Sequence, residues 1–217
     1  MIELDQRSVG IDEVGRGAWA GPIVGAAVFF PKKISVPKSV RLMDSKLLTK
    51  NQKMCSDQFI REHGVFVIKS VSLKTMSQKG VQEANKKVFE LCVGAMKKKL
   101  KNSKGISFFI DGLRPKNFFL TAHFIPHGDR LHQTIAAASI IAKVARDQMM
   151  TALSEQYPQY GFERHVGYGT RAHYEALLKY GPCPIHRRSF APIKKILAAR
   201  EAEANSYEHH NNESVIK

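Results

Sequence analysis

Four acidic side chains stand at or just past the ends of three short, strand-like stretches. Asp12 and Glu13 close "SVGIDE", Asp111 closes "ISFFID", and Asp129 follows "TAHFIP" in the loop "HGDR". Carboxylates gathered in one place repel one another and raise each other's pKa, so such a cluster is costly unless cations occupy it. Oxygen ligands without matching histidine or cysteine suit Mg²⁺ or Mn²⁺, and a pair of such ions is a common device for phosphodiester displacement. The four acids therefore indicate a two-metal site for phosphodiester chemistry.

Each acid alone also has a simpler explanation. An isolated acid after a strand is usually a turn former or a helix cap, and Asp129 just before a helix fits an N-cap. Period-two alternation would send Asp12 and Glu13 to opposite faces of a regular strand. Both reach one site only if the strand ends or bulges between them, and Gly15 and Gly17 directly afterwards allow such a distortion.

The charge balance indicates a polyanionic partner. The 217 residues include 34 lysines and arginines against 19 acids, a formal net charge of +15. Such an excess commonly marks a nucleic-acid partner, and a basic protein without one is the alternative. Apolar residues make up 43% of the chain, which is ordinary for a globular protein and enough for one domain with a sizeable core and an appendage.

Cysteines and apolar runs favour a cytoplasmic protein. Cys55, Cys92 and Cys183 are widely spaced and match no metal or disulfide pattern, which favours a reducing compartment. The longest uncharged run, residues 17–31, is too short to span a bilayer, and the acids before it do not fit a signal peptide. We therefore expect no membrane partner.

The elements that must position the acids follow from apolar periodicity. The pattern predicts strands at residues 7–14, 22–30, 64–73, 106–111 and 121–126. It predicts helices at residues 81–100, 131–158, 170–180 and 190–203. This order describes a mixed α/β sheet with helical cover. The residues that follow lack apolar periodicity, so we expect disorder there.

Six segments, in order and spacing, resemble the type 2 ribonucleases H, the ribonuclease HII family, over roughly residues 8–192. They are "GIDEVGRG", "DSK" at residues 44–46, "FIDG", "GDR…AAASIIAKVARD", "YPQYGFERHVGYGT" and "HRRSF". The resemblance implies a ribonuclease H-like fold, with a mixed five-stranded sheet flanked by helices and a C-terminal helical extension. It implies a catalytic core at residues 1–157, an extension completing the substrate cleft at 158–203, and a disordered tail at 204–217.

The activity implied by the resemblance is metal-dependent endonucleolytic cleavage on the 5′ side of a ribonucleotide. The substrates are RNA/DNA hybrids and single ribonucleotides embedded in duplex DNA, and the products carry 3′-hydroxyl and 5′-phosphate ends. By resemblance Asp12, Glu13, Asp111 and Asp129 are the catalytic residues that hold two Mg²⁺ or Mn²⁺ ions. We expect a monomer, and the sequence does not say whether a replication clamp binds it. Two other classes stay open: an inactive nucleic-acid-binding module on the same fold, and a DNA-directed nuclease.

The resemblance also assigns contacts with the substrate. Gly15, Arg16 and Gly17 match the turn that contacts the 2′-hydroxyl and the adjoining phosphate, and Tyr168 matches a tyrosine that stacks on the neighbouring deoxyribose. The simpler alternatives are a tight hairpin turn and a half-buried core tyrosine. Further substrate-binding or supporting residues are expected to be Ser45, Lys46, Ser139, Lys143 and Arg146.

The chain departs from the family pattern where three usual lysines are replaced. The replacements are Leu47, His127 and Val166. They remove phosphate contacts, so they bear on affinity and salt dependence rather than on the chemistry. Three histidines have no metal-ligand spacing, namely His165, His173 and His186. We expect the first of them to be structural or to lie near the substrate.

Overall fold

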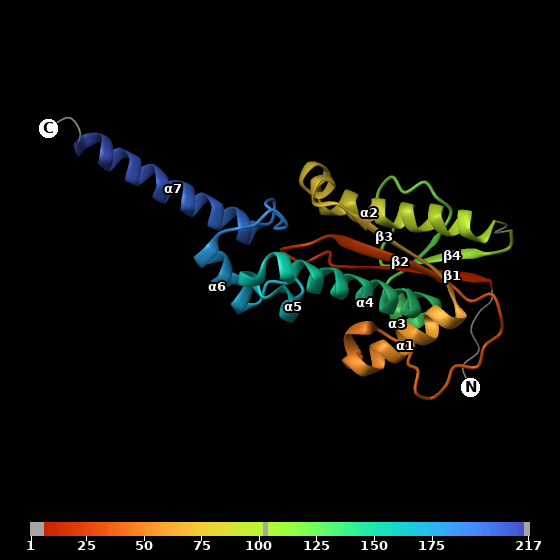
Figure 1. The fold of residues 1–217 in the computed structure, drawn as a ribbon. Coiled ribbons are helices and arrows are strands. Elements are labelled where there is room, and N and C mark those ends of the chain that lie inside the picture. Colours follow the sequence, from red (N-terminus) through yellow and green to blue (C-terminus); the bar gives the residue numbers. More distant parts are fainter. Residues whose placement is uncertain (1–6, 102–103, 215–217) are drawn as a thin grey trace. The chain divides into compact units, whose positions relative to one another are not determined.

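The computed structural model describes residues 7–101 and 104–214, which fall into two units (Figure 1). The first unit consists of the chain up to Arg16 and of Pro22–Met149. The second consists of Gly17–Gly21 and the chain from Met150 onward. Each unit has an apolar core of its own.

The first unit is built on a five-stranded mixed sheet. Its strands are β1 (Ser8–Val14), β2 (Ile23–Phe29), β3 (Val65–Val71), β4 (Ser107–Asp111) and β5 (His123–Ile125). Their order across the sheet is β3-β2-β1-β4-β5. Strand β2 is antiparallel to β1 and β3, while β4 is parallel to β1 and β5. The predicted mixed five-stranded sheet is confirmed.

Helices cover both faces of this sheet (Figure 1). Helix α2 (Leu73–Leu100) packs on one face, and α1 (Lys50–His63) with the first part of α4 (Gln133–Gln156) packs on the other. Strand β2 packs against the helices on both faces of the sheet, because its apolar residues do not alternate with polar ones. Ala27 belongs to the apolar cluster under α2, and Val28 belongs to the cluster under α4. All of its residues are buried, as expected for an interior strand.

A glycine lets α4 lie directly on β1. At Gly10 an added Cβ would overlap the backbone of Thr134 and Ile135, in the first turn of α4. This close approach needs a residue without a side chain. It brings α4 against the strand that carries the first two predicted acids.

The structure adds a helix that the sequence analysis did not predict, α1. Thr49 and Gln52 form a capping box at its start: the Thr49 hydroxyl accepts from the Gln52 amide at 3.3 Å, and the Gln52 side chain accepts from the Thr49 amide at 2.9 Å. Its apolar stripe is narrow, with Phe59 and Ile60 as the buried apolar residues, so periodicity gave little signal. Helix α2 also begins earlier than predicted, at Leu73 and not at residue 81. Gly80 (φ 81°), just before the predicted start, breaks the helical geometry.

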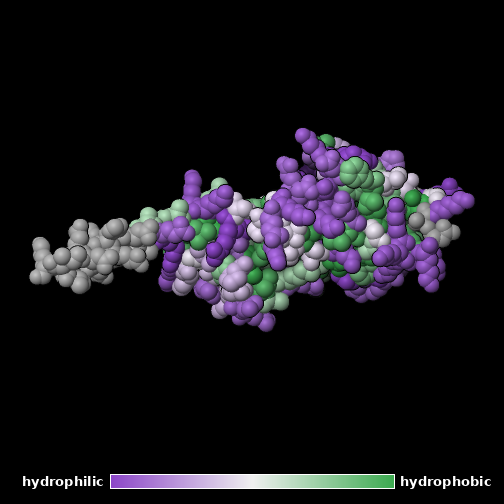
Figure 2. Space-filling view, turned by 90° about the horizontal axis from the view of Figure 1, so that it is seen from above, coloured by the Kyte–Doolittle hydropathy of each residue, from purple (hydrophilic) through white to green (hydrophobic). Residues whose placement is uncertain are grey.

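The outward face of α2 is strongly basic. Seen from this side, hydrophilic side chains cover much of the surface (Figure 2). The exposed lysines of the helix are Lys74, Lys79, Lys87, Lys97, Lys98 and Lys99. Part of the +15 charge is thus gathered on one helix of the first unit.

The second unit is helical. After the end of α4 its helices are α5 (Phe162–His165), α6 (Arg171–Tyr180) and α7 (Ala191–Ser214). They share a core whose buried members include Met150, Tyr160, Phe162, Leu177, Ile193 and Ile196. The two units divide inside α4, between Met149 and Met150. The domain boundary expected between residues 157 and 158 stays a prediction.

The segment Gly17–Gly21 belongs to this helical unit. The Trp19 amide donates to the Gly167 carbonyl at 2.8 Å, and the Gly21 amide donates to the Ile185 carbonyl at 2.9 Å. The chain therefore leaves the first unit after Arg16 and returns to it at Pro22. The sequence analysis treated this stretch only as a turn between two strands.

Helix α7 continues through Ser214, and residues 215–217 lie outside the described part. The disorder expected for the tail at residues 204–217 stays a prediction. The run "AAREAEAN" at residues 198–205 is rich in strong helix formers, so a helix can continue without an apolar stripe. Neither α7 nor any other helix within the described ranges is long and apolar enough to cross a membrane.

Candidate active site

The first three predicted acids lie where the sheet opens at the end of β4. Pairing of β1 with β4 ends at Ile11 and Ile110, whereas pairing of β1 with β2 continues to the end of the strand. Asp12 and Glu13 therefore lie on a part of β1 that has lost one neighbour, and Asp111 is the last residue of that neighbour. The register with β2 stays regular, so of the two expected alternatives, a strand end or a bulge between Asp12 and Glu13, the bulge is wrong. Instead, Asp12 and Glu13 lie on the edge of β1 that β4 leaves unpaired.

Asp12 is buried among other charges. Its Oδ1 accepts from the Glu13 amide at 2.7 Å. Burial raises the pKa of Asp12 well above its ordinary value, and the charges of Glu13 and Asp111 raise it further. Hydrogen bonds from Ser139 and from the Glu13 amide act in the opposite direction. The ionised form of Asp12 thus needs a positive neighbour to be favourable.

Glu13 is in a similar electrostatic position. Burial raises its pKa to about 7, and the charge of Asp111 contributes to the rise. The positive charges of Arg16 and Lys46 lower the pKa of Glu13 without cancelling the rise. Both cations are exposed, so they also face whatever binds at this edge.

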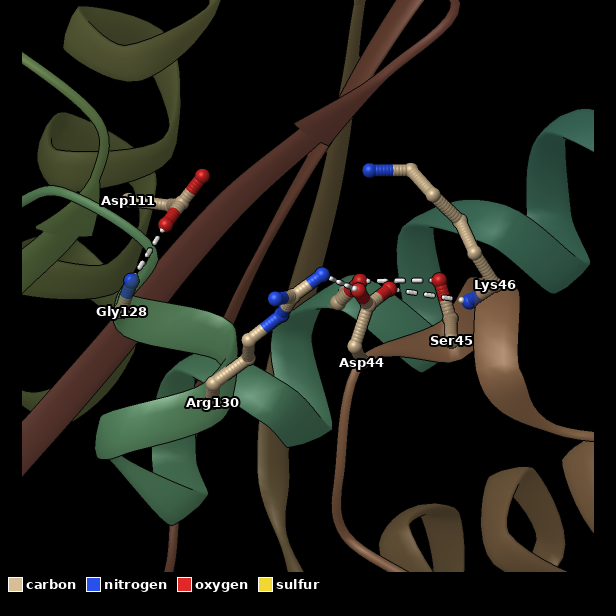
Figure 3. Close-up of polar contacts among 7 residues, drawn as sticks. Asp44, Ser45, Lys46, Asp111, Gly128 and Arg130 are labelled. Atoms are coloured by element: carbon tan, nitrogen blue, oxygen red, sulfur yellow. Dashed lines mark hydrogen bonds and ion pairs between the residues drawn. The ribbon is translucent and has the colours of Figure 1, made fainter.

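Asp129 is brought to the same cluster by a tight turn. It lies in the short helix α3 (Gly128–Leu131), which the chain enters through His127 in the left-handed conformation (φ 56°). The Gly128 amide donates to Asp111 Oδ1 at 2.6 Å and ties this turn to the end of β4 (Figure 3). Burial raises the pKa of Asp129, and the charge of Asp111 adds to the rise. Asp111 thus raises the pKa of all three other acids and is their common neighbour.

Asp44 is a fifth carboxylate, which the sequence analysis did not predict. It is buried and accepts from the Lys46 amide at 3.0 Å and from the Arg130 guanidinium at 3.2 Å (Figure 3). Burial pushes the pKa of Asp44 upward, but these two partners outweigh burial and the pKa is lowered. Its charge raises the pKa of Asp129, so it belongs to the same electrostatic cluster. The signal was present in "DSK", where only the serine and the lysine were assigned a role.

Two serines connect this loop to the acids. Ser45 Oγ and Ser139 Oγ are 2.9 Å apart, and Ser139 also hydrogen-bonds Asp12. Both serines are buried, and in this structure Ser139 supports Asp12 directly while Ser45 supports Ser139. Their part in substrate binding stays a prediction. Lys143, one turn further along α4, is half-buried and forms an ion pair with Asp147 at 2.7 Å.

Arg146 braces the turn that follows β1. It is fully buried, and its Nε donates to the Pro22 carbonyl at 3.0 Å. Gly15 (φ 89°) makes room for it, because an added Cβ there would overlap the Arg146 side chain. In the free protein Arg146 therefore supports the Gly15 turn. Its predicted part in substrate binding stays a prediction. Arg16, next in the chain, is exposed.

The remaining predicted residues, Gly17 and Tyr168, belong to the second unit. Tyr168 is half-buried, and its carbonyl accepts from His173 Nδ1 at 2.9 Å. The part of Gly17 and Tyr168 in substrate binding stays a prediction.

Buried histidines hold the backbone of Tyr168 in the second unit. A carbonyl can only accept, so His173 carries its proton on Nδ1, and its Nε2 accepts from His186 Nε2 at 2.9 Å. His186 Nδ1 in turn accepts from the Cys183 amide at 2.9 Å. These bonds fix both rings as neutral tautomers, and burial lowers the pKa of His173 and of His186 to about 4. His165 is buried beside them, and its Nε2 donates to the Tyr160 carbonyl at 2.7 Å.

This histidine chain predicts how the second unit responds to acid. The pKa of His173 and His186 is about 4 in the fold against 6.5 ordinarily, so the unfolded chain binds more protons between these values. Stability is therefore full above about pH 6.5 and is lost toward pH 4, by at most about 1.4 kcal/mol per pH unit for each histidine. Trp19 is the one tryptophan of the chain, its ring centroid is 5.5 Å from that of His173, and its fluorescence reports on this unit.

The measurement is a urea unfolding series between pH 7.5 and pH 4.5 that is followed by Trp19 emission. His173→Gln removes one titrating ring, so we expect its midpoint to fall less steeply with pH, even if the variant is less stable at pH 7.5. Equal pH slopes in the two proteins would show that the histidine chain does not control acid stability.

The four predicted acids could serve as metal ligands. Within residues 7–101 and 104–214, no three histidine, cysteine, aspartate or glutamate side chains are arranged as a group that could hold a metal ion. The chemistry of the acids nevertheless fits a hard divalent cation, because all four offer carboxylate oxygens. Burial and mutual repulsion raise the pKa of Asp12, Glu13 and Asp129, and a bound cation would oppose both effects.

The fold is that of the ribonucleases H. It resembles the chain in a structure of the PCNA:RNase HII complex from Archaeoglobus fulgidus, with a TM-score of 0.66 and 23% identity over 85% of this chain and 95% of that one. It also resembles Bst-RNase HIII in complex with Mn²⁺, with a TM-score of 0.67 and 21% identity over 88% of this chain and 69% of that one. The predicted fold class is therefore confirmed.

The sequence identifies the family. Residues 9–193 match the Ribonuclease HII family. A Ribonuclease HII from Acetivibrio thermocellus is 44% identical over 182 residues, which are 83% of this chain and 68% of that protein. The chain belongs to the ribonuclease HII family. It is a ribonuclease H, a hydrolase of the nuclease class.

Proposed function

We propose that this protein cuts a nucleic-acid strand on the 5′ side of a ribonucleotide. Its substrates are RNA/DNA hybrids and duplex DNA with a single embedded ribonucleotide, and its products carry 3′-hydroxyl and 5′-phosphate ends. The observation that carries the proposal is the cluster of acids at the end of β4, which raise one another's pKa and lie next to the exposed Arg16. Membership of the ribonuclease HII family supports it.

Asp12, Glu13, Asp111 and Asp129 would hold two divalent ions, Mg²⁺ or Mn²⁺. Such ions, when bound, help to deprotonate the attacking water and stabilise the leaving oxygen. The protein's part is to fix the carboxylates beforehand. The Gly128 amide holds Asp111 at 2.6 Å, and the Glu13 amide holds Asp12 at 2.7 Å. Lys46 and Arg16 supply positive charge for the phosphates of the bound strand.

The turn at Gly15, Arg16 and Gly17 would contact the ribose of the substrate and recognise its 2′-hydroxyl. Glycines allow the backbone to approach a ribose closely, and Arg16 offers a cation for the adjoining phosphate. The buried Arg146 supports this reading, since it holds the turn against α4 through the Pro22 carbonyl at 3.0 Å. Tyr168 would stack on the deoxyribose that follows the ribonucleotide.

The proposal extends to the partners and surroundings of the enzyme. The net charge of +15 supports a polyanionic substrate, and the basic face of α2 is one place where that charge gathers. We propose that the protein acts as a monomer in the cytoplasm. The structure of an RNase HII from Archaeoglobus fulgidus in a complex with PCNA supports a replication clamp as a partner.

The test is cleavage of duplex DNA that contains one ribonucleotide. The protein is incubated with the labelled duplex in Mg²⁺, in Mn²⁺, or in a chelator, and the ends of the products are analysed. We expect one cut on the 5′ side of the ribonucleotide in either metal and none in the chelator. Cleavage in the chelator, or cleavage at a different bond, would refute the proposed function.

A further inference from the structure

A pocket adjoins the acid cluster on the side of α2. It has a volume of about 600 Å³ and lies within the first unit. Asp111 and Arg16 form part of its wall, so it is continuous with the proposed active site. The rest of the wall comes from α2 and from the loops after β4 and β5, and it includes Asn85, Lys116 and His127. Whatever occupies the pocket therefore lies next to the strand that is cut.

Asn85 is an unusual member of this wall. The residue is 8% exposed, and its Oδ1 is turned to the interior, where it has less than 1 Å² of accessible surface and no hydrogen-bond partner in the part of the chain that the structure describes. A buried acceptor without a donor destabilises a fold, and native proteins keep few of them. The terminal torsion of asparagine is broad and roughly two-fold, so the amide can turn over and bring this oxygen to the pocket, where it meets an incoming donor. Its place in the pocket indicates a ligand that donates a hydrogen bond.

The charges of the pocket narrow the chemistry of that ligand. Arg16 and Lys116 are exposed cations, which suit the phosphates of a nucleic-acid strand. The wall also holds two carboxylates, Asp111 and Glu83, of which Glu83 is paired with Lys86 at 2.7 Å. Phosphate oxygens only accept, so they cannot satisfy the oxygen of Asn85. In a paired duplex the Watson–Crick donors are used by the opposite strand, whereas the 2′-hydroxyl of a ribonucleotide is displayed in the minor groove as a free donor. A ribonucleotide thus offers both groups that this pocket can bind.

We propose that the pocket receives a second nucleotide, next to the one read by the Gly15 turn, and that Asn85 accepts a hydrogen bond from its 2′-hydroxyl. Asn85 then distinguishes a run of ribonucleotides from an isolated one. This inference rests on the proposed function, because the strand reaches the pocket only when it is bound for cleavage. The amide oxygen, unpaired in the free protein, acquires its partner in the complex with RNA.

The experiment is a double-mutant cycle in which one change is a substitution in the protein and the other is a second ribonucleotide in the substrate. Wild type and Asn85→Leu are compared on duplex DNA with one ribonucleotide and on duplexes with a second ribonucleotide on the 5′ or the 3′ side of the first. A neutral hydrogen bond is worth about three- to tenfold in rate. We expect the second ribonucleotide on one side to raise kcat/KM of the wild type by about this factor, and we expect the gain to vanish in Asn85→Leu. Both proteins should cut the single-ribonucleotide duplex at rates within about twofold.

Ser8→Ala is the matched control. Ser8 is also buried and has an unpaired Oγ among the described residues, but it lies at the opposite end of β1 and not in the pocket wall. Both variants should unfold at the wild-type temperature or above it, because each loses a buried polar atom without a partner. Only Asn85→Leu should lose the gain from the second ribonucleotide.

The outcomes separate the failure of this inference from failure of the proposed function. If the wild type cuts none of the duplexes, the proposed function fails. If it cuts them and Asn85→Leu keeps the gain, or slows cleavage of every duplex equally, Asn85 does not read a second sugar. A gain that depends on a guanine at the second position would show that a base donor is bound, and this also overturns the inference.

Discussion

Replacing Asp111 by asparagine is expected to slow cleavage by about 10³-fold or more and to leave the unfolding temperature unchanged or raised. Asp111 is the common neighbour of the other acids, and its charge raises the pKa of Asp12, Glu13 and Asp129. An asparagine keeps an oxygen that can accept from the Gly128 amide, so the turn that carries Asp129 can stay in place. What is lost is one negative charge at the centre of the cluster.

The expected gain in stability follows from the direction of these pKa shifts. A carboxyl group whose pKa is raised in the fold ionises more readily when the chain unfolds, so it destabilises the fold at neutral pH. Removing the charge of Asp111 lowers the pKa of its three neighbours toward their ordinary values. The stabilisation should be fully present above about pH 7, should shrink as the pH falls through the raised pKa values, and should be absent below the ordinary carboxyl pKa of about 4.

Asp57→Asn is the control for the loss of one charge. Asp57 is a buried acid of α1 that pairs with Arg61 at 2.7 Å, outside the cluster. This variant should cut at a rate within about twofold of the wild type but should unfold at a lower temperature, because a buried partner is removed. Undiminished cleavage by Asp111→Asn in saturating Mg²⁺ would exclude Asp111 as a metal ligand. A large loss of stability in that variant would instead assign it a structural role.

The acids could be predicted because their signal is local. Each stands at the end of an apolar, β-rich stretch, and a strand of a sheet delivers its last residues to one edge. The way in which Asp12 and Glu13 share a site could not be predicted, because it depends on where β4 stops. The sequence left open a strand end or a bulge, whereas the register shows a regular strand whose pairing with β4 ends at Ile110.

The residues whose surroundings could not be predicted from the sequence are those whose role depends on tertiary packing. Asp44 is a fifth acid of the cluster only because the fold brings Arg130 and Asp129 to it. Arg146 looks like a surface cation on a polar helix face, yet it is fully buried against the Gly15 turn. No spacing rule distinguishes a buried arginine from an exposed one when its partner is a backbone carbonyl 124 residues away.

The largest effect that we expect is on the rate of cleavage, and it depends on a single 2′-hydroxyl of the substrate. On two duplexes that are identical except for this group, we expect the wild type to cut the ribonucleotide-containing one about 10⁴- to 10⁵-fold faster than the all-DNA one. A site built to hydrogen-bond a hydroxyl rejects the analogue that lacks it, because its own polar groups are then left unpaired. The measurement is the ratio of kcat/KM on the two duplexes at one salt concentration.

Variants of the turn test whether it produces this ratio. Arg16→Ala should lower the rate on the ribonucleotide duplex by about 10²-fold, as expected for the loss of a charged positioning contact. Arg61→Ala removes the same charge from α1 and should change the rate by no more than about twofold once the salt concentration is fixed. Gly15→Val should do at least as much harm as Arg16→Ala. The new side chain would need a φ near 89° and would overlap Arg146, so this variant should also be less stable.

Arg146→Met distinguishes a turn that reads the sugar from a turn that only connects two segments. Methionine fills much of the same space but cannot donate to the Pro22 carbonyl, which Arg146 Nε contacts at 3.0 Å. If the brace holds the turn in its reading position, the ratio between the two duplexes should fall in this variant even where enough folded protein remains to cut. An unchanged ratio in Arg146→Met and in Arg16→Ala would remove the Gly15 turn from sugar recognition, and equal cleavage of both duplexes by the wild type would exclude a sugar-reading site altogether.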